Sequence, residues 1–237
     1  MTQPTTEEET GAKLLPPLAN GDRLDQPTFH ERYEAMPPGT HAELIGGEVH
    51  MPSPVSWDHG SMQDDTGYWL RTYRRATPGM LSASTPTCVM GVTFEPQPDH
   101  TLFLREDCGG QVRRRGKYIG GSPELVAEIA LTSESIDLHR KRDEYERHGV
   151  QEYIVVGLHQ GRVIWFTRQD DAFVELTAGN DGLLRSAIFP GLWLDPLALL
   201  AEDLERVLTV LALGLATPEH AAFVAELERR RAERSQP

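Results

Sequence analysis

One acidic residue interrupts an otherwise apolar run and is the first candidate for chemistry. Glu128 stands within Leu125-Val126-Ala127-Glu128-Ile129-Ala130-Leu131, which is too short for a typical helix and is typical of a strand buried on both faces. An ionised carboxylate away from water is costly unless it is paired, hydrogen-bonded or bound to a metal. The rest of the sequence must therefore supply partners for Glu128.

Two further groups can converge with this carboxylate. Asp99 follows Pro98 at the start of a predicted strand, and Lys141 lies on the helix predicted after the Glu128 strand. Converging carboxylates bind a hard cation such as Mg²⁺, which offsets their repulsion and polarises a phosphate. A nearby ammonium can orient or help deprotonate the attacking water, or stabilise the charge that develops at phosphorus. These residue types predict metal-dependent phosphodiester hydrolysis.

Each of the three residues also has an ordinary structural interpretation. A Pro-Asp pair usually marks a turn, a buried glutamate can simply pair with an arginine, and a helical lysine is usually solvated. Other catalytic patterns are missing from the sequence: it has no G-x-S-x-G, H-E-x-x-H or C-x-x-C, and residues 110–118 fail the phosphate-loop pattern. Cys88 and Cys108 are expected to be plain reduced thiols.

The elements that must position the three groups are read from hydrophobic periodicity and turn residues. We expect helices over residues 29–36, 57–75, 196–214 and 218–231, and a further helix that begins at Ser133 or Ser135 and ends at 149. We expect hairpins over 42–51 and 153–167, and strands over 87–94, 101–105, 124–131 and 189–194. Strands on both sides of a helix, with one strand apolar throughout, predict an α/β domain with a mixed sheet.

Composition sets the domain organisation that we expect. Residues 1–24 are rich in Pro, Glu and Thr and predict a disordered tail, 25–203 form the main domain, and 204–237 form a C-terminal helical extension. No apolar stretch reaches the ~20 residues that span a bilayer, and the N-terminus lacks the pattern of a signal peptide. We expect no membrane partner and a cytoplasmic location.

The charge balance restricts any nucleic-acid role to local patches. A net charge of −13 argues against broad attraction to a polyanion. The basic groups available are Arg71, Arg74 and Arg75; Arg113, Arg114, Arg115 and Lys117; and Arg140, Lys141 and Arg142. Each group taken alone is more simply explained as solvated surface charge.

Several segments, taken in order, resemble a known family. They are Glu43–Glu48 with the later His59, Pro98-Asp99, Pro123–Ile129, Asp137–Lys141 with Tyr145, Gly149-Val150, Glu152-Tyr153 and Phe189–Leu192. No single segment is specific, but their order and spacing resemble the Uma-type putative restriction endonuclease family of the PD-(D/E)XK nuclease superfamily. The resemblance covers about residues 28–200.

This resemblance implies a fold and a set of metal ligands. The fold is a restriction-endonuclease-like core, a mixed sheet flanked by helices, here with an extra N-terminal hairpin and C-terminal helices. Asp99 and Glu128 are implied as ligands of Mg²⁺, with Mn²⁺ as a possible substitute, assisted by the main-chain carbonyl of Ile129. DNA is the implied substrate.

The sequence departs from the usual superfamily pattern at the lysine. The lysine normally lies two residues after the second acid, where this chain has Ala130, and Lys141 matches a position that has moved to the following helix. Only the tip of the side chain has to reach the site. The family also often has a Ser and an Asp where this chain has Leu131 and Gly157.

Two residues are second-tier candidates. Glu43 could add a carboxylate, although an exposed acid is common beside a Gly-Gly turn. His59 lies on the apolar stripe of its helix, where a packed histidine is more common than a catalytic one. His100 should point to the opposite face of its strand from Asp99 and is excluded from the predicted site.

Three functions fit these residues. The first is a Mg²⁺-dependent DNA endonuclease, working as a homodimer because cutting two strands commonly uses two sites related by a dyad. The second is a non-catalytic interaction or regulatory module that retains the nuclease fold, which the acidic charge favours. The third is a hydrolase of small phosphate esters, which requires a closed pocket at the acids.

Overall fold

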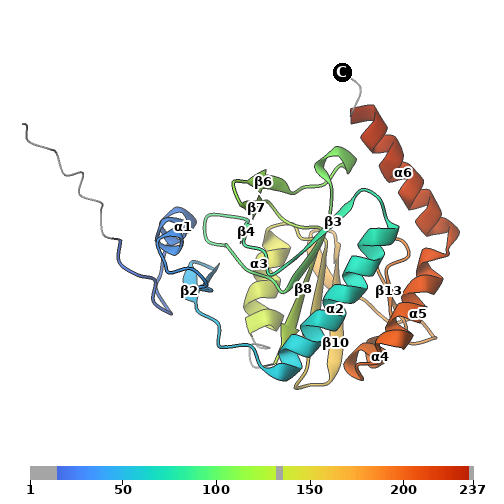
Figure 1. The fold of residues 1–237 in the computed structure, drawn as a ribbon, viewed down its shortest axis with the longest axis horizontal. Coiled ribbons are helices and arrows are strands. Elements are labelled where there is room, and N and C mark those ends of the chain that lie inside the picture. Colours follow the sequence, from blue (N-terminus) through green and yellow to red (C-terminus); the bar gives the residue numbers. More distant parts are fainter. Residues whose placement is uncertain (1–14, 132–135, 235–237) are drawn as a thin grey trace, which may run out of the picture.

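The computed structural model describes residues 15–131 and 136–234, and a six-stranded mixed sheet forms its centre (Figure 1). The strand order is β11-β10-β9-β8-β5-β3, in which β8 and β9 are parallel and the other pairs antiparallel. The strands are β3 (Met80–Ser84), β5 (His100–Leu104), β8 (Leu125–Ala130), β9 (Glu152–Gly157), β10 (Arg162–Gln169) and β11 (Ala172–Glu175). The predicted α/β class is confirmed.

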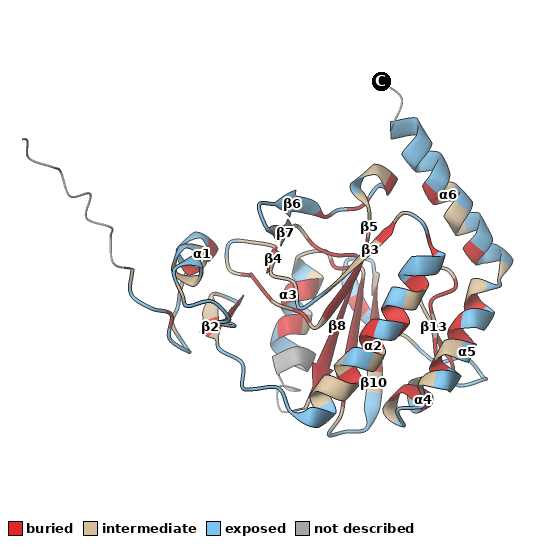
Figure 2. Cartoon of the chain, viewed as in Figure 1, coloured by how far each residue is buried: buried red, intermediate tan, exposed pale blue. Residues whose placement is uncertain are grey.

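The two central strands have the burial that their composition predicts. Every residue of β8 and of β9 is buried, as expected for parallel strands covered on both faces (Figure 2). In the β5–β8 pair, His100 lies opposite Ala127. This antiparallel register brings the residue before His100, Asp99, level with Glu128 on the neighbouring strand.

Helices cover both faces of the sheet. Helix α2 (Trp57–Ala76) packs on one face through Met62, Trp69 and Leu70, as the predicted 57–75 helix requires. On the other face, a π-helical segment η2 (Ile136–Lys141) leads into α3 (Arg142–Arg147), whose Tyr145 packs among Phe94, Tyr153 and other buried side chains. The predicted caps of this helix, Ser133 and Ser135, lie outside the described residues.

The N-terminal hairpin is as predicted, and part of the segment that we assigned to the disordered tail packs against it. Strands β1 (Glu43–Ile45) and β2 (Glu48–His50) pair around Gly46-Gly47, and α1 (Gln26–Glu34) begins three residues before the predicted helix. Within the segment assigned to the tail, Leu18 is buried and the Gly21 amide donates to the Val49 carbonyl at 2.8 Å. Residues 15–24 therefore lie against the hairpin.

Smaller elements surround the sheet. They are β4 (Cys88–Val89), η1 (Glu106–Cys108), β6 (Arg113–Arg115), β7 (Tyr118–Gly120), β12 (Leu184–Arg185) and β13 (Trp193–Leu194). The predicted strand 87–94 is reduced to β4, which pairs with β7. The predicted closing strand 189–194 does not join the main sheet, since β13 pairs only with β12 among the described strands.

The prediction of one continuous helix over residues 196–214 is wrong. The structure has two helices, α4 (Pro196–Leu200) and α5 (Leu204–Leu215), followed by α6 (Pro218–Arg234). Glu202 adopts a left-handed conformation with φ of 55°, and the Asp203 carboxylate caps α5 by accepting from the Arg206 amide. No single helix in the described chain has the length and apolar character of a membrane span; α5 and α6, a bent pair, meet that test of length and composition only together.

A buried acid at the start of β9 fastens the chain between β12 and β13 to the sheet. Glu152 is fully buried, and its carboxylate accepts from the Ser186 hydroxyl at 2.8 Å and the Ala187 amide at 2.7 Å. Burial raises the pKa of Glu152 to about 7, against the opposing effect of these hydrogen bonds. The fold therefore binds a proton here more tightly than the unfolded chain does.

We predict that Glu152→Gln flattens the pH dependence of stability. Because the folded pKa lies above the unfolded one, this group's contribution is complete below about pH 4.5 and is lost as the pH rises towards about 7. The loss is on the order of 3 kcal/mol. Urea unfolding across this window should show a smaller decline for Glu152→Gln than for wild type. Exposed Glu175→Gln is the control, and equal slopes for wild type and Glu152→Gln would contradict the prediction.

Candidate active site

A lysine and two glutamates from three separate elements meet in the interior. The Lys141 ammonium lies 3.0 Å from Glu128 Oε1 and 3.1 Å from Glu43 Oε2. Lys141 comes from η2, Glu128 from the middle of β8 and Glu43 from β1. The three residues are only 6%, 4% and 8% exposed. Solvent therefore screens this ion pair weakly.

Asp99 joins the same cluster through the pairing of β5 with β8. Its Oδ2 accepts from the Ile129 main-chain amide at 2.8 Å, and its own amide lies 3.4 Å from Glu128 Oε2. Each of the two carboxylates thus lies next to a main-chain amide of the neighbouring segment. His100 turns to the α2 face, where its Nε2 contacts the Gln63 carbonyl at 2.6 Å.

His59 lies at the edge of the cluster. It stands in the first turn of α2, and its Nε2 is 3.5 Å from Asp99 Oδ2. The Ser56 side chain fixes this turn by accepting from the His59 amide at 3.3 Å. The apolar stripe of the helix led us to expect a packed histidine, whereas the structure places its ring beside an acid.

Two supporting contacts were not foreseen from the sequence. The Tyr145 hydroxyl donates to Glu128 Oε1 at 2.9 Å, and the Gln97 amide donates to Glu43 Oε1 at 2.6 Å. Burial, followed by the charge of Glu128, raises the pKa of Tyr145, so the phenol remains a donor. The signal for Tyr145 was its spacing: it lies four residues after Lys141, on the same side of a helical segment.

The charge of this cluster suits a bound cation. Glu43 and Glu128 contact the Lys141 ammonium and Asp99 lies beside Glu128, so these four side chains carry a formal charge of −2 when the three acids are ionised. A cation offsets the repulsion between neighbouring carboxylates. Mg²⁺ prefers oxygen ligands and usually keeps several waters, so two carboxylates and a main-chain oxygen suffice. Among the described residues, no three His, Cys, Asp or Glu side chains already form a metal-binding group.

A thiol also lies close enough to these acids to sense their charge. Cys88 is fully buried, and burial, followed by the charges of Glu128 and Glu43, raises its pKa. A protonated thiol is a poor nucleophile and a poor metal ligand. This environment supports the prediction that the cysteine takes no part in the chemistry.

A mixed sheet between helices, with carboxylates gathered on two adjacent strands, defines a restriction-endonuclease-like α/β protein. The chain belongs to the Uma2 family, described as "Putative restriction endonuclease", whose profile matches residues 28–199. The family assignment made from the sequence is confirmed.

A solved structure shares the fold. It is that of a putative nuclease belonging to DUF820 from Anabaena variabilis ATCC 29413, with a TM-score of 0.53 at 13% identity, covering 76% of this chain and 97% of that one. At this level of identity the similarity concerns the fold alone. No curated protein matches the chain significantly.

We predict that neutralising the lysine of the buried ion pair destabilises the protein much more than neutralising one of its glutamates. Lys141→Met removes the ammonium that the buried acids Glu43 and Glu128 share and should lower the free energy of unfolding by about 3 kcal/mol. Glu128→Gln removes one charge from an excess of acids and keeps an acceptor for Tyr145, so its stability should stay within about 1 kcal/mol of wild type. Urea unfolding measures both.

Arg140→Met is the matched control. The neighbouring arginine pairs with Glu48 at 3.1 Å, but its side chain is 47% exposed, so this change should cost under about 1 kcal/mol. A Lys141→Met protein that is no less stable than Arg140→Met would show that the ion pair does not hold these elements together.

Proposed function

We propose that this protein is a divalent-metal-dependent endonuclease that hydrolyses phosphodiester bonds of DNA in the cytoplasm. One observation carries the proposal: Glu128 lies within hydrogen-bonding distance of both the Lys141 ammonium and the Asp99 amide, although the three residues come from different segments of the chain. These are the residues that the family resemblance implies as metal ligands and assisting lysine. Membership of a family of putative restriction endonucleases supports the same reaction.

Asp99 and Glu128, with the main-chain carbonyl of Ile129, are the groups that would hold Mg²⁺, with Mn²⁺ as a substitute. When bound, the ion offsets the excess negative charge and polarises the scissile phosphate. The Ile129 amide already holds Asp99 Oδ2, and the Tyr145 hydroxyl holds Glu128 Oε1. Both carboxylates are therefore orientated before any ligand arrives, which lowers the cost of organising the site.

Lys141 is the residue that we propose to act on the attacking water. Its ammonium lies against Glu128, and Glu43 holds it from the other side. From there it can orient a water and stabilise the negative charge that accumulates on the phosphoryl oxygens. Glu43 is thus proposed as a positioning residue. His59, beside Asp99, can do the same for that carboxylate.

A non-catalytic module with the nuclease fold is the second candidate. The net charge of −13 favours it, because duplex DNA carries one negative charge per ~1.7 Å. The third possibility, a hydrolase of small phosphate esters, receives less support. Two hollows on the described surface, of about 640 and 270 Å³, are lined by residues other than Asp99, Glu128 and Lys141.

We predict that the wild-type protein converts supercoiled plasmid DNA to nicked or linear forms with Mg²⁺ or Mn²⁺. Glu128→Gln and Lys141→Ala should each lower the cleavage rate by about 100-fold or more, since each removes a group that acts on the reacting phosphate or its water. Glu152→Gln is the matched control, a fully buried glutamate that accepts from Ser186 and the Ala187 amide, and should cleave at the wild-type rate.

Metal binding separates the endonuclease from the module. Isothermal titration calorimetry should detect Mg²⁺ or Mn²⁺ uptake by the wild type and its loss in Asp99→Asn. A folded wild-type protein that takes up neither ion and cuts no form of DNA is the result that favours the non-catalytic module.

We further predict a homodimer in solution. Trp57, at the start of α2 near the His59 end of the site, is 88% exposed, whereas Trp69 is fully buried in the core. A large exposed aromatic is typical of an interface. Light scattering should return twice the 26.5 kDa chain mass at micromolar concentration, and Trp57→Ala should shift it towards the monomer. A wild-type monomer at that concentration would remove the dimer.

A further inference from the structure

A polar hollow lies between α2 and the edge strand β3. It has a volume of about 270 Å³, and its lining includes Arg71 and Arg74 of α2, Ser82 and Ser84 of β3, and His100 and Thr101 of β5. No acidic side chain lines it within the described part of the chain. Two guanidinium groups and several hydroxyls surround a space that is large enough for a phosphate group and its waters.

The floor of this hollow is built by the close approach of a histidine to a glycine. A Cβ on Gly67 would lie 2.5 Å from Cε1 of His100, so only glycine lets the ring pack under the helix. Burial lowers the pKa of His100, and the neutral ring donates from Nε2 to the Gln63 carbonyl while Ser84 Oγ lies 3.2 Å from Nδ1. The ring is therefore held at both nitrogens and fixes the hollow's shape.

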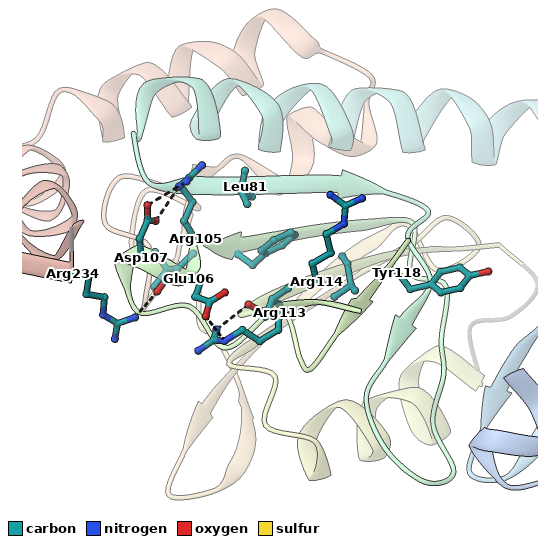
Figure 3. A pocket seen from close by; sticks show the side chains of 12 residues that line it. Leu81, Arg105, Glu106, Asp107, Arg113, Arg114, Tyr118 and Arg234 are labelled. Atoms are coloured by element: carbon teal, nitrogen blue, oxygen red, sulfur yellow. Dashed lines mark hydrogen bonds and ion pairs between the residues drawn. The ribbon is translucent and has the colours of Figure 1, made fainter. Parts of the chain in front are cut away.

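The two arginines of this hollow have no carboxylate partner among the described residues, which distinguishes them from several other basic groups of the protein. In the larger hollow (Figure 3), Arg105 pairs with Asp107 and Arg113 with Glu106, both at 3.0 Å. Arg140 and Lys117 pair with other glutamates. Arg71 and Arg74 form no ion pair with any described residue, and both are exposed. Their charge is available to a ligand.

The hollow lies close to the candidate active site. Ser84 pairs with His100, the residue after Asp99, and the amide of Thr85, directly after β3, donates to the Asp99 carbonyl at 2.9 Å. Along α2, His59 and Arg71 are separated by about 18 Å at 1.5 Å per residue. That distance corresponds to roughly five steps along a DNA strand at 3.4 Å per step.

We propose that this hollow binds a backbone phosphate of the DNA substrate, about five nucleotides from the bond that is cut, through Arg71 and Arg74. The proposal rests on the proposed endonuclease function and adds a substrate-binding subsite to it. It also explains how an acidic protein can hold DNA. Negative charges more than about 8 Å from the DNA are largely screened at physiological salt, so positive charge is needed only along the surface that contacts the strand.

The test is DNA binding without cleavage. Fluorescence anisotropy with a labelled duplex of about 20 base pairs, in EDTA, gives the Kd at several salt concentrations. Arg71→Ala/Arg74→Ala should raise the Kd by about tenfold or more and lower the slope of log Kd against log salt by about 2, because each arginine neutralises about one phosphate. Both residues are exposed, so the variant should melt at the wild-type temperature.

A matched control removes the same charge elsewhere. Arg75→Ala/Arg114→Ala takes two exposed arginines from outside the hollow and should bind within about twofold of wild type. Ser82→Asp provides a second, independent variant, because it keeps both arginines and places a negative charge in the hollow. It should weaken binding as much as the arginine pair does.

The outcomes separate this proposal from the endonuclease function. The phosphate subsite is wrong if Arg71→Ala/Arg74→Ala binds DNA like wild type, or if both double variants lose the same affinity. In either case, plasmid cleavage by the wild-type protein would still support the endonuclease function. Wild-type protein that neither binds nor cuts DNA overturns both. Glu128→Gln should bind DNA like wild type but fail to cut it. This result would show that phosphate binding in the hollow and phosphodiester hydrolysis use different residues.

Discussion

The contact between the Lys141 ammonium and the carboxylates of Glu43 and Glu128 is the constraint on which the site depends. It joins the N-terminal hairpin, the central strand β8 and the helical segment η2, next to the apolar cluster in which Ile45, Val126 and Tyr145 connect the hairpin and β8 to α3. Burying an ion pair removes both charges from water, and that cost often exceeds the attraction gained. An apolar trio would pack as well in a protein selected for stability alone. Retaining three charges here is easier to explain by chemistry than by folding.

Burial of an acid is not in itself the mark of this site. Glu95, Glu124 and Glu152 are also buried, and each has partners suited to a structural role. Glu124 accepts from the amides of Leu104 and Gln111, and Glu152 accepts from Ser186 and the amides beside it. Neutral donors thus satisfy Glu124 and Glu152, whereas Glu95 is held by the Gln26 amide and the His30 ring. Glu128 differs from all three because it shares a lysine ammonium with a second carboxylate, and such a cluster changes its charge when a cation or a phosphate enters.

The parts of the fold that could be predicted from the sequence are those determined by local pattern. The stripe of α2, the uniformly apolar β8 and the Gly46-Gly47 turn each carry their signal within a few residues. The convergence of Asp99 with Glu128 followed from a resemblance in spacing, and the register of β5 on β8 supplies its physical basis. Strand β3 was not predicted because Met80–Ser84 contains small polar residues and becomes a strand through pairing with β5, a partner about twenty residues away.

The same distinction applies to charge. Composition gives a net charge of −13, and from that number a nucleic-acid partner looks unfavourable. Net charge, however, sums charges over the whole protein, and most of them lie too far from any one point on the surface to act there through solvent and salt. What a DNA strand meets is the local balance, and this depends on which arginines are neutralised by neighbours far away in the sequence, such as Arg140 by Glu48. Pairing of that kind is set by tertiary structure, so the sequence could name the basic groups but could not show that Arg71 and Arg74 lack an acidic partner among the described residues.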